Sequence, residues 1–173
     1  GLMVIALWIV LAMLAPQIAP YERLKQDVNI RLQAPDAIHA FGTDELGRDM
    51  LSRVLWGAQI TIPAGVLVII FGSVVGVIVG AVAGFAGGLW DELLMRITEL
   101  FMAFPTIILA LAITAALGAD TRNAIVALAV VWWPTYARLV RGLVLEVKSK
   151  EYVEGTRSVG ATGFYVLFKT VLP

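Results

Sequence analysis

Residues 54–90 read VLWGAQITIPAGVLVIIFGSVVGVIVGAVAGFAGGLW and contain no charged side chain. A helix needs about 20 mainly apolar residues to cross the hydrocarbon core of a membrane, and this stretch is longer. Within it, Gly72, Gly76, Gly80 and Gly84 recur every four residues. Such residues share one helix face, and a glycine face lets another helix approach closely. We therefore predict a membrane helix packed against a helix of the same chain; the alternative is a subunit contact or a pore wall.

Further apolar runs lie on both sides of this helix. Residues 1–21, 100–119 and 123–137 are free of charge, and a fifth apolar run, 164–172, contains only Lys169. These runs predict an all-α membrane protein with four spans plus the start of a fifth. Buried helices of a soluble protein are the alternative, and the number of apolar runs argues against them.

The first run, residues 1–20, is interpreted as a retained span rather than a signal peptide. It has no charged beginning, and its end, APQIAP at 15–20, has prolines where cleavage would need small residues. The chain begins with Gly1 and stops at Pro173 directly after a new apolar run. We therefore expect a piece of a longer protein, truncated at the C-terminus.

The composition excludes several classes of function. Apolar residues make up 60% of the chain, against about 45–50% in globular proteins. The 13 basic and 13 acidic residues balance, so no net field attracts nucleic acid. The lack of cysteine excludes disulfides and thiolate chemistry, and His39 is the only histidine. Because no Asp, Glu or Lys lies in the middle of a predicted span, an ion-coupled carrier or an intramembrane hydrolase is disfavoured.

Basic residues predict the orientation of the spans. Lys and Arg near span ends favour the cytoplasmic side. Six of the 13 basic residues lie between 138 and 169, so we place this segment in the cytoplasm and residues 21–58 outside the membrane. The six are Arg138, Arg141, Lys148, Lys150, Arg157 and Lys169. Arg138 is expected to reach the inner surface; substrate binding is its alternative role.

The extracytoplasmic segment 21–58 contains a polar motif, FGTDELGRDMLSRVLWG at 41–57. Thr43 is expected to cap a helix that carries acidic residues in its first turn. The apolar residues that follow fall on one face, which predicts an amphipathic helix over 43–57 at the membrane interface. A metal site formed by Asp44, Glu45 and Asp49 is the disfavoured alternative, because Arg48 competes for these carboxylates.

A second polar segment, residues 146–163, contains residues that are typical of helix starts and helix ends. Ser149 or Lys150 can begin a helix that runs to Val159, and Gly160 can end it. Thr162 can cap the next helix. The segment therefore predicts a short helix–turn–helix on the cytoplasmic side. A solvated loop does not need these helix start and stop signals. A docking element does need them, because it must be rigid.

The residues of this segment resemble a known family. Glu154-Gly155-Thr156, Gly160 and Leu172-Pro173 resemble the "EAA" loop of ABC importer permeases, with Gly155 and Thr156 where alanines are usual. Other motifs resemble the dipeptide/oligopeptide/nickel branch, on the side of its "C" permease. They are FGTDELGRD at 41–49, GGLWDELLMR at 87–96, FP at 104–105 and YARLVRG at 136–142.

The resemblance implies the transmembrane domain of a type I ABC importer, which normally has six spans. Residues 59–173 would be the permease core, with a coupling loop at 149–163. Such a permease lies in the cytoplasmic membrane of a prokaryote and moves substrate, here peptides, by alternating access. The residues implied to couple it to an ATPase are Glu151, Glu154, Gly155, Thr156, Arg157 and Gly160.

The implied partners are a second permease, two cytoplasmic ABC ATPases, an extracytoplasmic solute-binding protein and membrane lipid. The chain itself would be no enzyme and would hold no cofactor, because ATP and Mg²⁺ bind to the ATPases. A passive channel and a structural membrane subunit are the alternatives. Dipeptides, oligopeptides, glutathione and nickel complexes stay open as substrates.

Overall fold

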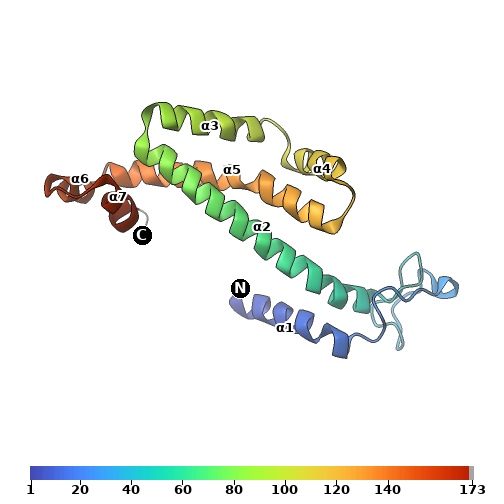
Figure 1. Ribbon diagram of the computed structural model, residues 1–173. Coiled ribbons are helices and arrows are strands. Elements are labelled where there is room, and N and C mark those ends of the chain that lie inside the picture. Colours follow the sequence, from blue (N-terminus) through green and yellow to red (C-terminus); the bar gives the residue numbers. More distant parts are fainter. Residues whose placement is uncertain (172–173) are drawn as a thin grey trace. The chain divides into compact units, whose positions relative to one another are not determined.

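The computed structural model describes residues 1–171, and these contain helices and no strand (Figure 1). They divide into two compact units, Gly1–Val66 and Leu67–Pro173, with the boundary inside a long helix. The all-α prediction is thereby confirmed for the described residues. The helices are α1 Leu2–Ile18, η1 Val28–Ile30, α2 Met50–Ala86, α3 Gly88–Met102, α4 Thr106–Leu117, α5 Thr121–Lys148, α6 Glu151–Ser158, α7 Gly163–Tyr165 and η2 Val166–Val171.

Two helices, α2 and α5, are each long and apolar enough to cross a membrane. A third span exists if α3 and α4 are counted together, although they are bent by 84° relative to each other. The apolar helix α1 has 17 residues, or about 26 Å at 1.5 Å per residue, against about 30 Å for the hydrocarbon core. The described residues thus provide two or three spans of standard length rather than four.

The third predicted span, residues 100–119, is broken in the structure. Pro105 precedes α4, and proline has no N–H to continue the hydrogen bonds of α3. The stretch before this break, residues 88–102, is helical as α3. Charged residues recur along one face of this helix, so the sequence contains no charge-free run here that would indicate a span. The fifth predicted run is helical up to Val171, and Leu172-Pro173 lie outside the described residues.

The glycine stripe of α2 packs against α5, as the sequence predicted. A Cβ atom on Gly76 would collide with Tyr136 and would lie 2.9 Å from the backbone nitrogen of Ala137. A Cβ atom on Gly80 would lie 2.9 Å from Cβ of Val140, and α5 crowds Gly84 in the same way. The two backbones therefore approach each other at a distance that only glycine permits.

The unit Gly1–Val66 joins α1 to the start of α2 through the loop at 19–49. The side-chain amide of Gln59 in α2 donates to the carbonyl oxygen of Ala12 in α1 at 2.8 Å. The backbone N–H of Tyr21 donates to Oγ of Ser52 at 3.0 Å, and the indole N–H of Trp56 donates to the carbonyl of Tyr21 at 3.1 Å. These bonds hold the loop against the first turns of α2.

The predicted amphipathic helix over 43–57 is wrong in its first half, because α2 begins at Met50. The hydroxyl of Thr43 accepts from the N–H of Gln33 at 2.9 Å and so cannot cap a helix. Gly47 has a φ of 68°, which ends any helical path from Thr43. The capping residue is Asp49, whose carboxylate accepts from the N–H of Ser52 at 2.7 Å.

Candidate functional site

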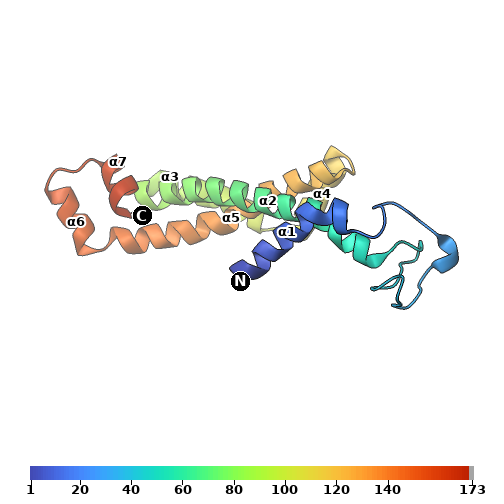
Figure 2. The ribbon, with the colours of Figure 1, turned by 90° about the horizontal axis from the view of Figure 1, so that it is seen from below.

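The segment after α5 forms the helix–turn–helix that the sequence predicted. Helix α6 follows the extended residue Lys150 and has Glu151 and Glu154 in its first turn. Acidic residues at this end stabilise a helix through its dipole. Gly160 has a φ of +85°, and Thr162 caps α7 by accepting from the N–H of Tyr165 at 3.3 Å. The turn at the end of α5 is visible in both ribbon views (Figure 2).

Helix α6 is anchored through Val153. This side chain is fully buried in a cluster with Val144 of α5 and with Val166 and Val171 of η2. Because a buried valine contributes to stability only while its neighbours enclose it, α6 is held against α5 and η2. A force on α6 is therefore passed to the helices on both sides of it.

A second anchor lies at the last turn of α2. Nζ of Lys148 in α5 donates to the carbonyl oxygen of Phe85 at 2.7 Å, and it lies 5.6 Å from the centre of the Phe85 ring. The guanidinium of Arg157 in α6 lies 5.5 Å from the same ring. Two cations thus contact one aromatic side chain, an arrangement in which each cation is attracted to the ring. Phe85 links α2, α5 and α6.

The opposite side of α6 is open. Within residues 1–171, neither Glu151 nor Glu154 makes an ion pair, and Tyr152 and Val159 are 55% and 85% exposed. A shallow depression of about 450 Å³ continues this surface and is lined by Thr156, Val159, Gly160, Ala161, Thr162 and Tyr165. The surface combines two free carboxylates with apolar groups, which suits a partner that offers basic and apolar side chains.

Gly155 and Thr156, which stand where alanines are usual in the family, fit into α6 without steric conflict. A Cβ atom at Gly155 would have no neighbour within 4 Å. The hydroxyl of Thr156 donates to the carbonyl of Tyr152 at 2.8 Å within the helix. Of the residues predicted to couple to an ATPase, Glu151, Glu154, Gly155 and Arg157 are exposed, and Thr156 and Gly160 border the depression. Arg157 also lies 5.5 Å from the Phe85 ring.

Sequence reasoning missed Phe85, Lys148 and the ion pair between α3 and α5. Nε and Nη2 of Arg141 lie 2.5 and 2.7 Å from the two carboxylate oxygens of Asp91, a bidentate pair that connects residues 50 positions apart. No periodicity in the sequence relates these positions. The basic side chain of Lys148 in the last turn of α5 was one available signal, because such residues often bind helix carbonyl oxygens.

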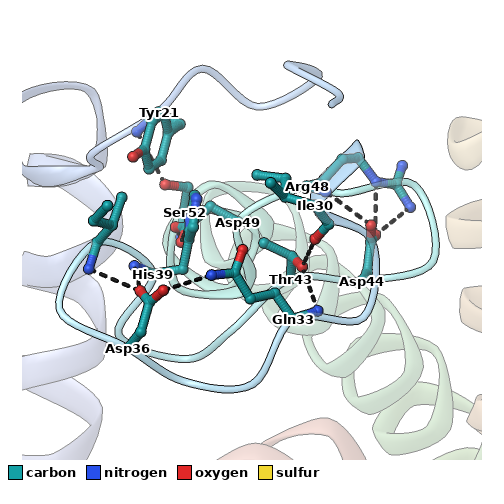
Figure 3. Close-up of polar contacts among 11 residues, drawn as sticks. Tyr21, Ile30, Gln33, Asp36, His39, Thr43, Asp44, Arg48, Asp49 and Ser52 are labelled. Atoms are coloured by element: carbon teal, nitrogen blue, oxygen red, sulfur yellow. Dashed lines mark hydrogen bonds and ion pairs between the residues drawn. The ribbon is translucent and has the colours of Figure 1, made fainter. Parts of the chain in front are cut away.

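In the polar motif at 41–57, Asp44 and Asp49 bond different partners (Figure 3). Asp44 pairs with Arg48 at 2.7 Å and with Arg53 at 2.6 Å. Asp49 lies 3.0 Å from Nδ1 of His39, and the ring of Tyr21 stacks on that histidine. Within residues 1–171 no group of three potential ligands could hold a metal ion.

Hydrogen bonds within this motif lower the pKa values of Asp44 and Asp49. Burial raises the pKa of Asp44, but hydrogen bonds from the backbone and side chain of Arg48 outweigh it and lower the pKa to about 2. Burial also opposes ionisation of Asp49, and bonds from Ser52 and His39 bring its pKa below the usual value. The loop is therefore built around ionised carboxylates.

Comparison with known proteins identifies the family. Residues 72–173 match the family described as "Binding-protein-dependent transport system inner membrane component". The chain is 43% identical over 170 residues to the "Glutathione transport system permease protein GsiD" of Shigella dysenteriae serotype 1 (strain Sd197). It is 42% identical to the proteins of the same name from Escherichia coli O157:H7 and Shigella sonnei (strain Ss046).

These alignments cover 98% of the chain and 56% of each relative, so the chain spans about half the length of the curated relatives it matches. The family match extends over the glycine stripe, the α3–α5 ion pair and α6. The predicted resemblance to importer permeases is thus confirmed, and the chain belongs to the inner-membrane components of binding-protein-dependent transport systems.

Proposed function

We propose that this chain is part of a permease subunit of an ATP-driven importer that moves peptide-like substrates across the cytoplasmic membrane. The observation that carries the proposal is the two-sided character of α6. Its Val153 side is buried against α5 and η2, and its Glu151, Tyr152 and Glu154 side is open. A helix of this kind can receive a force from a partner and transmit it to the membrane helices.

The proposed partners are a second permease, two cytoplasmic ATPases and an extracytoplasmic solute-binding protein. The description of the family as binding-protein-dependent supports the last of these. The exposed carboxylates and apolar groups of α6 support an ATPase with a basic and apolar groove. ATP and Mg²⁺ would bind to the ATPases rather than to this chain.

In the proposed mechanism, closure of the two ATPases moves α6 as a rigid element. Glu154 pairs with a basic residue of the ATPase, and Val153 carries α5 and η2 along. Lys148 of α5 and Arg157 of α6 pass the same motion to the end of α2, because both contact Phe85 in its last turn. The spans then change from inward-open to outward-open as packed units, as in other domain closures.

The proposed substrate class is peptides. The relatives are glutathione transport system permeases, which supports this class because glutathione is a peptide-like molecule. Choice among dipeptides, oligopeptides, glutathione and nickel complexes would rest mainly with the solute-binding protein.

The test uses the full-length permease in its complex with the ATPases. Glu154→Lys should abolish most substrate uptake while ATP hydrolysis and membrane insertion persist, because a lysine repels the basic partner. Glu45→Lys is a matched control, since Glu45 is also an exposed acidic residue but lies in the extracytoplasmic segment.

Normal uptake by the Glu154→Lys complex would overturn the coupling role. Uptake by the full-length permease without ATPases would support a passive channel instead. Failure of ATPases to co-purify with it would favour a structural membrane subunit.

A further inference from the structure

Helices α3 and α5 border a half-open polar cavity of about 430 Å³ that the proposed coupling mechanism does not use. Both ribbon views show these helices running alongside each other (Figures 1 and 2). The lining residues are Met95, Thr98, Glu99, Arg138 and Arg141. The volume falls in the range of about 300–1,000 Å³ that is typical of small-ligand sites.

The charges around the cavity do not cancel. Arg141 is neutralised by its bidentate pair with Asp91, at 2.5 and 2.7 Å. Glu99 has Arg96 as its partner at 3.5 Å. These two pairs leave Arg138 as the uncompensated charge of the lining.

Arg138 makes no ion pair within residues 1–171. One guanidinium nitrogen lies 3.6 Å from the sulfur of Met102, and a thioether is a weak acceptor. A guanidinium has five N–H donors, so most of its hydrogen-bonding capacity is unused by the chain.

The position of Arg138 along α5 makes it unfavourable to leave these N–H donors without an acceptor. Arg138 lies almost three turns before the end of α5 at Lys148, roughly 15 Å along the axis. A helix of 28 residues is about 42 Å long and exceeds the hydrocarbon core by about 12 Å. In the predicted orientation Arg138 therefore lies near the cytoplasmic edge of the core, where an arginine without a partner is unfavourable.

We propose that this cavity binds an oxyanion through Arg138. Carboxylate and phosphate groups accept two parallel hydrogen bonds from one guanidinium, which matches the unused donors. Thr98 and Met95 add uncharged groups to the lining, and the carboxylate of Glu99 in the same lining favours a ligand whose negative charge is confined to one end.

Two sources can supply such a group at this depth. One is the phosphate of an anionic phospholipid, because basic pockets between membrane helices on the cytoplasmic side bind such headgroups. The other is the carboxylate of a peptide-like substrate on its way to the cytoplasm, and this source rests on the proposed function.

The experiment uses the purified full-length permease in lipid nanodiscs. Its thermal unfolding is measured in phosphatidylcholine alone, in phosphatidylcholine with phosphatidylglycerol, and with trialanine or trialanine amide. The variants are Arg138→Gln, Arg138→Lys and the control Arg122→Gln, which removes an exposed charge from the other end of α5. The unfolding temperature without added ligand shows whether each variant folds.

A lipid site predicts that phosphatidylglycerol raises Tm by about 2–4 °C in the wild type and in Arg122→Gln. Arg138→Gln should lose this rise, and Arg138→Lys should keep part of it, because lysine retains the charge but not the paired donors. A substrate site predicts the same pattern for trialanine, with binding weakened about tenfold or more in Arg138→Gln, and no response to the amide.

Equal responses of the wild type and Arg138→Gln to both probes, or no response of the wild type to either, would overturn the proposal. The measurement needs no ATPase, so it is independent of the Glu154→Lys test. Loss of the lipid response in Arg138→Gln would support the anion site even if uptake proved independent of α6.

Discussion

The ammonium group of Lys148 donates a 2.7 Å hydrogen bond to the carbonyl oxygen of Phe85, and so joins the last turns of α5 and α2. The same ammonium lies 5.6 Å from the centre of the Phe85 ring, and the guanidinium of Arg157 lies 5.5 Å from the same ring. The end of α2 is therefore connected to both α5 and α6.

Replacing Phe85 with leucine should loosen α6 from α2. Leucine keeps an apolar side chain but removes the ring that attracts Lys148 and Arg157, an attraction of about 0.5–1 kcal/mol for each cation at a partly exposed site. Hydrogen exchange of the α6 amides should become faster, and uptake per ATP hydrolysed should fall. Phe85→Tyr keeps the ring and should behave like the wild type, so a coupling loss of equal size in both variants would contradict the role of the ring.

Shortening Val153 should destabilise the attachment of α6. This side chain is fully buried, and Val153→Ala should cost about 1–2 kcal/mol of local stability because it leaves a cavity among Val144, Val166 and Val171. Val159, which is 85% exposed, provides the control, and Val159→Ala should change stability by less than about 0.5 kcal/mol. Hydrogen exchange across residues 144–171 measures both effects; equal protection in the two variants would exclude the anchor.

A methyl group on the glycine stripe should separate α2 from α5. In Gly76→Ala the new Cβ atom would meet the backbone of α5, with Ala137 N at 2.9 Å, so the helices must move apart. We expect a lower Tm in nanodiscs by several degrees. Gly65→Ala on the same helix has open space and should raise stability slightly through its helix propensity. The prediction fails if Gly76→Ala is as stable as Gly65→Ala.

Acid should unfold the loop at 19–49 before it affects the long apolar helices. Asp44 has a pKa of about 2 in the folded loop, below its usual value of 3.8. A lowered carboxyl pKa stabilises the fold above the unfolded value, and this contribution is lost as the pH falls from about 4 through about 2. Protection of the loop from proteolysis by pepsin should therefore decline over this range.

Asp44→Asn is the comparison for the acid experiment. Asparagine cannot pair with Arg48 and Arg53, so this variant should be less protected at neutral pH and should show a smaller further loss on acidification. If the pH profile of Asp44→Asn matched that of the wild type, the loss of protection would have to come from Asp36 or Asp49, whose pKa values are also lowered.

The segments that the sequence predicted well are governed by local interactions. The end of α6 at Gly160 and the cap at Thr162 follow from a left-handed glycine and a side-chain oxygen, both of which act over a few residues. The start of α2 was misplaced because Thr43 has the right chemistry for a cap but bonds to Gln33, ten residues earlier. Asp49 has the same capping chemistry and caps α2, because its carboxylate accepts from the N–H of Ser52 at 2.7 Å.

The sequence by itself determined the helical membrane character of the chain, the glycine face of α2 and the limits of α6. Apolar segments of this length must bond their own backbone groups in lipid, and caps and turns are encoded locally. Only the tertiary structure decided which side chains meet: Asp91 with Arg141, Phe85 with Lys148 and Arg157, and Val153 with Val144. These pairs depend on the register in which separate helices pack, and the 3.6-residue period of one helix carries no information about the register of another.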